Sequence, residues 1–274
     1  MTANEQRQKT RRWEDMNPEI LSLIFVKIKE VDEMMRTVPF VCKPWMEVLD
    51  GPYCWSNIDI RKWCRRRNDG NAVDLVVKKL IRRSKCSVQS FSAYRMGEPG
   101  FFYVAHCGKF LKVLEIPMSS ITDQMVLKHI KPLPNLTTLD ISNCFKITRK
   151  GIAAFGNQCK SLVNLRRNMP PLDTCSPIDD SETKAIAETM PNLKKLDLCF
   201  GRFGDMGLSE ILTKCKSLTH LDIQGSWNVE LNGDLEERCE RLEHFQNPWV
   251  NYENDFCDSG GSDDDESEQE SESD

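Results

Sequence analysis

The chain has 274 residues, of which 39% are hydrophobic and 29% are charged, and its formal net charge at pH 7 is −5. This length allows one elongated repeat body with a small additional module, and without a run of about 18 apolar residues we expect no membrane span. Residues 1–12 are polar and basic, which argues against a secretory signal. The twelve cysteines are dispersed without a Cys-x-x-Cys pair, which favours a reducing compartment, the nucleus or the cytoplasm, over secretion.

The first predicted element is a helix that begins near Pro18. The sequence Asp15-Met-Asn17-Pro18 is a helix-start signal, because a proline in the first turn loses no hydrogen bond. The apolar residues that follow have helical spacing and form one stripe: Ile20, Leu21, Ile24, Phe25 and Ile28. A second apolar segment extends from Met34 to Trp45. Because about 45 residues enclose too little volume for a self-sufficient core, we expect a partner or the rest of the chain to cover part of this surface.

The segment 61–85 is strongly basic, with ten Lys and Arg residues against two Asp residues. An apolar stripe runs through its second half and predicts an amphipathic helix between two modules: Val73, Val76, Val77, Leu80 and Ile81. The charges are interpreted as a solvated helix face, with a nuclear-import signal or nucleic-acid contact as the alternative. No aromatic platform or groove-reading motif accompanies them, so nucleic acid is not an expected partner.

One phrase, Leu-x-x-Leu or Leu-x-x-aromatic, then occurs six times between Leu111 and Phe245, with successive copies 24 to 31 residues apart. Within 218–223, apolar and polar residues alternate as in a strand, whereas the apolar residues of 208–215 have helical spacing. One strand and one helix per unit is the pattern of a leucine-rich repeat. The predicted fold is α/β, a right-handed solenoid of about six to seven repeats that are stable only when stacked.

Such an array builds a long curved surface for another macromolecule. Residues that point outward from the strands, or lie just beyond them, are therefore the candidates for contact with a bound protein: Asp140, Ser142, Arg166, Lys195, Asp197, His220, Asp222, Gln224, Trp227 and His244. Arginine and aromatic side chains often dominate interfaces. The alternative is that the outward acids only form hydrogen bonds with neighbouring strands.

One interval is longer than the others. Leu162 and Leu193 are 31 residues apart, and the excess includes a proline-rich stretch within 166–178. This stretch is either a tolerated loop or part of the binding surface. In the same copy, Arg166 and Arg167 occupy positions where an acid and an apolar residue are expected.

No pattern for catalysis or metal binding is present. The chain lacks the GxSxG, P-loop, HExxH and dinucleotide glycine patterns, and its four histidines are scattered without a paired nucleophile. Cys159, Cys215 and Cys239 each precede a repeat's first leucine by three residues. Because they belong to different turns of the array, we interpret them as small buried residues rather than metal ligands. We expect no catalytic residue, metal or cofactor.

The two ends of the chain differ from the rest. Residues 257–274 hold nine acids and no base, and they contain too little apolar surface to offset the entropy of ordering. We expect these residues, and residues 1–11, to be disordered. Ser262 and Ser267 are followed by acids and resemble acidic-directed kinase sites.

The N-terminal motifs resemble an F-box. Pro18-Glu-Ile-Leu21-Ser-Leu-Ile24-Phe25 is followed by Val41-Cys42-Lys43-Pro-Trp45 and by Gly51-Pro52-Tyr-Cys-Trp55, although the usual opening Leu-Pro is Asn17-Pro18 here. The run 55–60 is similar to the join between the two parts of plant F-box/leucine-rich-repeat proteins. The repeats with Cys159, Cys215 and Cys239 resemble the cysteine-containing subclass common in F-box proteins. The motifs in this order cover roughly residues 12–250.

This resemblance implies an F-box over 12–57, a basic helical linker over 58–85 and leucine-rich repeats over 86–256. It further implies a non-catalytic substrate receptor, in which the F-box binds a Skp-type adaptor of a cullin-RING (SCF) ubiquitin ligase and the repeats bind a protein substrate. The residues that match adaptor-facing positions are Pro18, Ile20, Leu21, Ile24, Phe25, Val41 and Cys42. The alternatives are that these residues only cap the first repeat, and that the chain is a repeat scaffold or inhibitor without a ligase.

Overall fold

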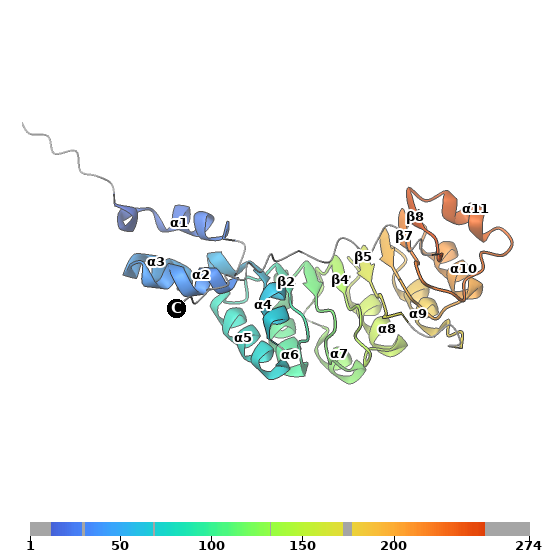
Figure 1. The fold of residues 1–274 in the computed structure, drawn as a ribbon, viewed down its shortest axis with the longest axis horizontal. Coiled ribbons are helices and arrows are strands. Elements are labelled where there is room, and N and C mark those ends of the chain that lie inside the picture. Colours follow the sequence, from blue (N-terminus) through green and yellow to red (C-terminus); the bar gives the residue numbers. More distant parts are fainter. Residues whose placement is uncertain (1–11, 29–30, 68, 132, 172–176, 250–274) are drawn as a thin grey trace, which may run out of the picture.

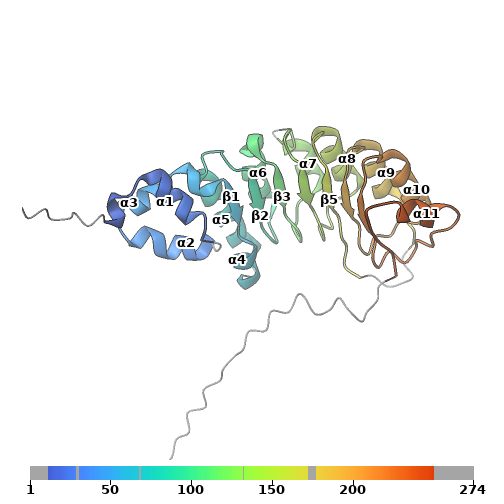
Figure 2. The ribbon, with the colours of Figure 1, turned by 90° about the horizontal axis from the view of Figure 1, so that it is seen from above.

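The computed structural model describes residues 12–28, 31–67, 69–131, 133–171 and 177–249. A group of short helices is followed by a curved body with strands along its concave side and helices along its convex side (Figure 1, Figure 2). The two segments expected to be disordered, 1–11 and 257–274, lie outside the described residues. Among the helices described, none has the length and apolar character needed to cross a membrane.

The N-terminal module consists of η1 (Trp13–Asp15), α1 (Pro18–Phe25), α2 (Val31–Thr37), η2 (Val38–Phe40), α3 (Lys43–Asp50) and η3 (Pro52–Trp55). The Asn17 side chain accepts a hydrogen bond of 2.7 Å from the Glu19 N–H, so it caps α1 as the Asn-Pro signal predicts. The interior of the module is small and is formed by Leu21, Phe25, Met34, Val38 and Leu49. The Phe25 ring packs on Trp45 with the ring centroids 5.0 Å apart.

The strands form one parallel sheet in chain order: β1 (Asn57–Asp59), β2 (Ser90–Ser92), β3 (Val113–Glu115), β4 (Thr138–Asp140), β5 (Asn164–Arg166), β6 (Lys195–Asp197), β7 (His220–Asp222) and β8 (His244–Gln246). The predicted α/β solenoid after an N-terminal helical module is confirmed. The described sheet has eight strands, more than the six to seven repeats predicted, because β1 and β2 lack the leucine phrase. Ile58 and Phe91 take the buried central position there.

Helices cover the other side of the sheet: α5 (Gly70–Arg83), α6 (Glu98–His106), η4 (Gly108–Phe110), α7 (Asp123–His129), α8 (Arg149–Gln158), α9 (Ser181–Thr189), α10 (Asp205–Lys214) and α11 (Leu235–Glu240). The helix α4 (Arg61–Arg66) instead lies beyond the ends of β1 and β2 (Figure 2). The central residues of successive strands stack with the helices into one core. Leu114, Leu139 and Leu196 are each 0% exposed, and burial of such a leucine contributes roughly 1.5–3 kcal/mol. The core therefore depends on stacking, as predicted.

Carboxylates at the starts of α7 and α10 tie these repeats to the ones that follow. Asp123, the first residue of α7, accepts hydrogen bonds from the N–H groups of Thr148 and Gly151 at 2.8 and 2.9 Å. Asp205, the first residue of α10, does the same for the N–H groups of 230–232 at 2.9 to 3.1 Å. These bonds satisfy loop N–H groups that have no partner in their own repeat.

Residues 58–85, expected to be a basic helical linker, contain the end of β1 and the helices α4 and α5. The amphipathic helix is present, since α5 buries Val73, Val77, Leu80 and Ile81. Because β1 pairs with β2, this segment forms the first turn of the solenoid. Beyond it, Cys86 and Cys107 form a disulfide between the segment after α5 and the end of α6. The dispersed cysteine spacing did not indicate this pair.

Candidate functional site

The first candidate surface is the outward face of α1 in the N-terminal module. Helical spacing turns Leu21 and Phe25 into the module, where each is 1% exposed. Ile20, Leu23 and Ile24 lie on the opposite side and are 51%, 66% and 39% exposed, as the i, i+3, i+4 relation requires. Hence α1 carries apolar residues on two faces, and only one face is covered by the residues that the structure describes.

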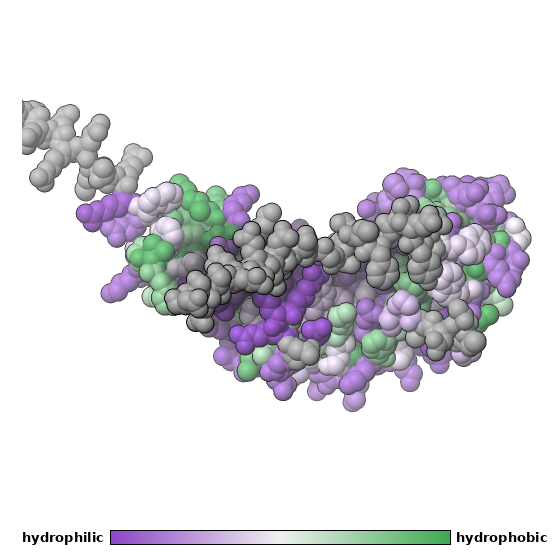
Figure 3. Space-filling model, in the orientation of Figure 1, coloured by the Kyte–Doolittle hydropathy of each residue, from purple (hydrophilic) through white to green (hydrophobic). Residues whose placement is uncertain are grey.

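Further apolar side chains of the module are exposed and gather over its surface (Figure 3): Trp13, Val26, Phe40, Val41, Met46 and Tyr53. Of the predicted adaptor-facing residues, Pro18, Ile20, Ile24 and Val41 are exposed and Cys42 is half-buried. Leu21 and Phe25 are core residues instead, because the module needs them for its own interior. Leu23, Phe40 and Tyr53 are exposed beside the predicted residues, and the sequence analysis did not include them.

The second candidate surface is the concave face of the solenoid, where the strand register aligns outward side chains in two columns. From β1 to β8 the first column contains Asn57, Ser90, Val113, Thr138, Asn164, Lys195, His220 and His244. The second contains Asp59, Ser92, Glu115, Asp140, Arg166, Asp197, Asp222 and Gln246. Most of the predicted contact residues therefore lie together on one surface.

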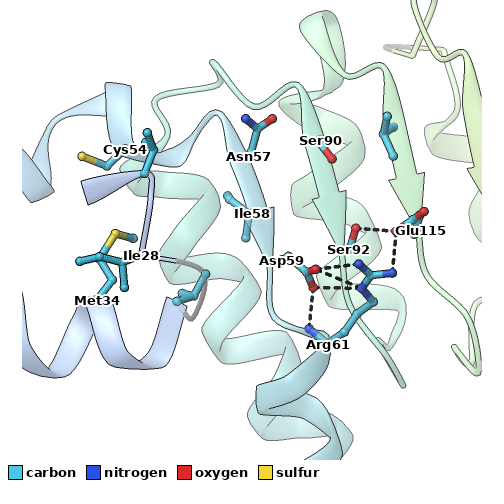
Figure 4. A pocket seen from close by; sticks show the side chains of 13 residues that line it. Ile28, Met34, Cys54, Asn57, Ile58, Asp59, Arg61, Ser90, Ser92 and Glu115 are labelled. Carbon is cyan, nitrogen blue, oxygen red and sulfur yellow. Dashed lines mark hydrogen bonds and ion pairs between the residues drawn. The ribbon is translucent and has the colours of Figure 1, made fainter. Parts of the chain in front are cut away.

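The second column carries a series of ion pairs across the strands. Arg61 lies between Asp59 and Glu115, with nitrogen–oxygen distances of 2.7 and 3.0 Å (Figure 4). Arg166 lies 3.0 Å from Asp197 and 3.9 Å from Glu115. Pairs this exposed contribute only about 0–1 kcal/mol each, but a bound protein has to compete with them for the same carboxylates.

The remaining acids of the column also have partners within the chain. Asp140 accepts the Ser142 N–H at 2.9 Å and Asp222 accepts the Gln224 N–H at 3.1 Å. Burial raises the pKa of Asp197, and Asp222 and Asp140 add to the rise against the lowering effect of Arg166. The bonds of Asp140 and Asp222 lie within their own repeats, whereas Asp197 bonds to the neighbouring strand through Arg166. The acids of this column outnumber Arg61 and Arg166.

The first column ends in a pair of histidines. His220 and His244 are register partners on β7 and β8, and their ring centroids are 4.3 Å apart. The His220 Nδ1 lies 2.7 Å from the Thr219 hydroxyl. Burial, together with the positive charge of Lys195 and the neighbouring His244, lowers the pKa of His220. The lowered pKa of His220 favours its uncharged imidazole at neutral pH.

A cavity of about 340 Å³ lies where the N-terminal module meets the first strands (Figure 4). Val26, Ile28, Val31 and Met34 form its apolar wall, and residues of β1 to β3 with Arg61 form its polar wall. Its polar groups already bond to one another, as when the Ser92 hydroxyl donates to Glu115 at 2.9 Å. The cavity has room for a side chain of a bound protein.

Arg167 is a structural residue that sequence reasoning noticed only as an irregularity. Its side chain is 3% exposed, and it donates to the carbonyl oxygens of Ile141, Cys144 and Ile147 at 3.3, 3.1 and 2.8 Å. Two further bonds of 3.1 and 3.0 Å join it to the Glu182 carboxylate. Arg167 therefore takes the place of an apolar core residue and bonds one repeat to the next.

Three predicted contact residues lie beyond the strand ends. Ser142 is 8% exposed and its hydroxyl accepts the Asn168 N–H at 3.2 Å, so it supports the turn and is too buried to contact a partner. The Gln224 amide donates to Gln246 at 3.3 Å, while Trp227 is 38% exposed. Of the proline-rich stretch, residues 172–176 lie outside the described residues.

The repeat cysteines are buried, as interpreted from the sequence. Cys159, Cys215 and Cys239 are 1%, 2% and 0% exposed, and burial raises the pKa of their thiols to about 12, 11 and 12. A thiol of such high pKa is a poor nucleophile and metal ligand. In the described part of the chain, no group of three or more His, Cys, Asp or Glu residues is placed to hold a metal ion.

Comparison with known proteins gives matches over most of the chain. A leucine-rich-repeat family model matches residues 133–156. In Arabidopsis thaliana, F-box protein FBW2 is 38% identical over 81% of this chain and 70% of its own length. F-box protein SKIP19 is 30% identical over 83% of this chain and 74% of its own length. F-box protein SKIP1 is 27% identical over 84% of this chain and 84% of its own length. Among solved structures, a chain of the yeast Rad7 and Elc1 complex is similar at TM-score 0.42 and 15% identity, covering 79% of this chain and 62% of that chain.

Proposed function

The chain belongs to the plant F-box/leucine-rich-repeat family, and we propose that it is the substrate receptor of an SCF-type ubiquitin ligase. In this proposal the N-terminal module binds a Skp-type adaptor, and through it a cullin-RING complex, in the nucleus or the cytoplasm. The concave face holds a target protein for ubiquitination and proteasomal degradation. The chain contributes proximity rather than a catalytic group, because tethering makes the transfer effectively intramolecular.

The exposed apolar face of α1 is the observation that carries this proposal. Ile20, Leu23 and Ile24 form an outward stripe on a module whose own core is small. Large exposed apolar patches mark interaction sites, and burial of such surface contributes roughly 25 cal/mol per Å². A helical partner that lies across this stripe removes it from water, while Leu21 and Phe25 hold α1 in place from below.

The module is also fixed to the solenoid, which a receptor of this kind requires. The Trp55 indole is fully buried and donates to the Leu49 carbonyl at 2.6 Å. The Arg83 guanidinium of α5 lies 5.7 Å from the Trp55 ring centroid and 3.2 Å from Asp50 of α3. These contacts support a fixed spacing between the adaptor and the bound target.

On the substrate side, the proposal rests on charge. The five acids of the second column outnumber the two arginines that pair with them, Arg166 of the column and Arg61 at the start of α4. Complementary charge steers association and selects among partners, so the concave face favours a target segment that carries Lys or Arg.

Co-purification with a Skp-type adaptor tests the proposal. Ile20→Asp with Leu23→Asp introduces two charges into the outward stripe and is expected to remove the adaptor. The matched control, Leu75→Asp with Leu127→Asp, makes the same change at solenoid positions that are 68% and 54% exposed, and it should retain the adaptor.

Equal adaptor recovery with both double variants would contradict the proposal. A native chain that never binds the adaptor, yet still captures a protein through its concave face, would instead support the repeat scaffold. The double variant Leu21→Ala with Phe25→Ala is a separate case, because it weakens the module interior and removes adaptor binding by unfolding α1.

A further inference from the structure

Four arginines at one edge of the sheet have no carboxylate partner among the described residues. Arg65, Arg66 and Arg67 at the end of α4, and Arg95 after β2, are all exposed, and we call them the edge arginine cluster. Within the described ranges, Arg65 alone among the four has a side-chain hydrogen bond, of 3.1 Å to the Tyr94 hydroxyl, with its guanidinium 5.2 Å from the ring centroid. Guanidinium groups bind carboxylate and phosphate with two parallel bonds, so the cluster is a candidate anion-binding surface.

The fold holds this cluster in one place. The helix α4 starts directly after the carboxyl end of β1 and is anchored by Cys64, which is 0% exposed. It stands beyond the ends of β1 and β2 (Figure 2), where hydrophilic residues dominate the surface (Figure 3). Arg95 follows the adjacent strand, and its carbonyl oxygen lies against Gly70, the first residue of α5.

We propose that the edge arginine cluster is the docking surface for the chain's own acidic segment, residues 257–274. This segment holds nine acids and no base, so its charge is opposite to that of the cluster. The docking does not depend on the adaptor. As a consequence, the docked segment lies beside the concave face. There it competes with acidic parts of a bound protein for the edge arginine cluster.

The sheet register places the end of β8, from which the chain continues toward that segment, on the same edge as the cluster. The row that contains Asp59 of β1 also contains Gln246 of β8, and the chain leaves both strands at their carboxyl ends. Seven strand-to-strand steps separate the two strands, or about 34 Å. Residues 250–262 extend to about 43 Å, so the run of acids from Asp263 reaches α4.

Tethering favours the chain's own acidic segment over an acidic ligand that is not attached to the chain. An attached segment of this length acts at an effective concentration of order 1 mM. Phosphorylation of Ser262 and Ser267 adds roughly −1.5 to −2 charge at each site and strengthens the docking. A free nucleic-acid strand lacks this tether, so it has to compete with the attached segment at a correspondingly high concentration.

A labelled peptide of residues 257–274 tests the proposal by fluorescence anisotropy at two salt concentrations. The chain ending at residue 256 is expected to bind the peptide, with an affinity that falls as salt rises. The full chain is expected to bind it about tenfold more weakly, because its own segment competes. The doubly phosphorylated peptide should bind more tightly than the unmodified one.

Matched charge reversals locate the contact. In the shortened chain, Arg65→Glu, Arg66→Glu and Arg67→Glu together are expected to abolish peptide binding. The control reverses three exposed lysines on the opposite, amino edge of the sheet, Lys112, Lys194 and Lys216, and should retain most of it. Equal binding by the full and shortened chains, equal loss in both triple variants, or displacement of the peptide more readily by single-stranded RNA than by unlabelled peptide would each overturn the proposal.

Discussion

The N-terminal module and the concave face of the solenoid expose different kinds of side chain to solvent. The module exposes large apolar side chains that the described part of the chain leaves uncovered, with Leu23 66% and Phe40 82% exposed. The charged side chains of the concave face are largely paired with one another, as in the bond from Arg166 to Asp197. A surface of the first kind is stable only with a permanent partner, whereas a surface of the second kind tolerates being empty between targets. This difference fits a receptor that keeps its adaptor and exchanges its substrate.

The largest expected effect concerns the internal bonding of the solenoid. Arg167→Met removes five hydrogen bonds, so that Glu182 loses its cation and the Ile147 carbonyl its side-chain donor. The carbonyls of Ile141 and Cys144 keep their backbone N–H donors. The loss of one member of a buried pair costs about 3–5 kcal/mol, to be measured by urea unfolding. The neighbouring exposed residue is the control, since Arg166→Met should cost less than about 1 kcal/mol. Equal costs would show that Arg167 does not bond the repeats together.

The next effect separates the two faces of α1. Leu21→Ala leaves a cavity in the module and should cost about 2–5 kcal/mol, seen as faster hydrogen exchange of α1 and α3. Leu23→Ala, on the exposed face, should change stability by about 0.5 kcal/mol or less and yet weaken adaptor binding. If Leu23→Ala left the adaptor affinity unchanged, the outward face of α1 would not be the contact surface.

A smaller effect comes from two aspartates with opposite pH behaviour. Although burial opposes it, hydrogen bonds from the N–H groups of 230–232 hold the pKa of Asp205 below its ordinary value. Its contribution to stability is therefore present above the unfolded-state pKa and is lost as pH falls through the folded-state pKa. Removal of these bonds in Asp205→Ala should cost about 1 kcal/mol at neutral pH, with a smaller cost in acid.

The contribution of Asp197 to stability should depend on pH in the opposite direction to that of Asp205. Burial and the neighbouring acids raise the pKa of its carboxyl, so its charged form opposes folding. The stability of the folded chain therefore begins to decrease as pH rises through the unfolded-state pKa of Asp197. Removal of the nearest positive charge in Arg166→Met should raise this pKa further, which carboxyl-carbon NMR titration measures. A pKa that falls in the variant would contradict the ion-pair series of the concave face.

The smallest effect concerns the histidine pair on β7 and β8. The pKa of His220 should lie below its ordinary value in a proton NMR titration, because of burial and of Lys195 and His244. His244→Ala should move the pKa of His220 upward. Because the folded-state pKa is lowered, protonation favours the unfolded chain, so stability decreases as pH falls through the unfolded-state value.

The sequence predicted the fold where one pattern repeats and missed it where the pattern changes. The leucine phrase located β3 to β8, but Ile58 and Phe91 fill the same buried positions in β1 and β2 without that phrase. Periodicity showed that α1 is apolar, but it did not tell the inward face from the outward face, because both carry large side chains. Arg167 and the Cys86–Cys107 disulfide depend on contacts between distant segments, which spacing along the chain does not encode.

Calorimetric titration of the native chain with a purified Skp-type adaptor tests the central claim most directly. The account predicts one adaptor per chain and a negative heat-capacity change, the mark of apolar burial, with both lost in Ile20→Asp with Leu23→Asp. An adaptor that produces no binding heat at any temperature, or binding that the double variant leaves unchanged, would contradict it.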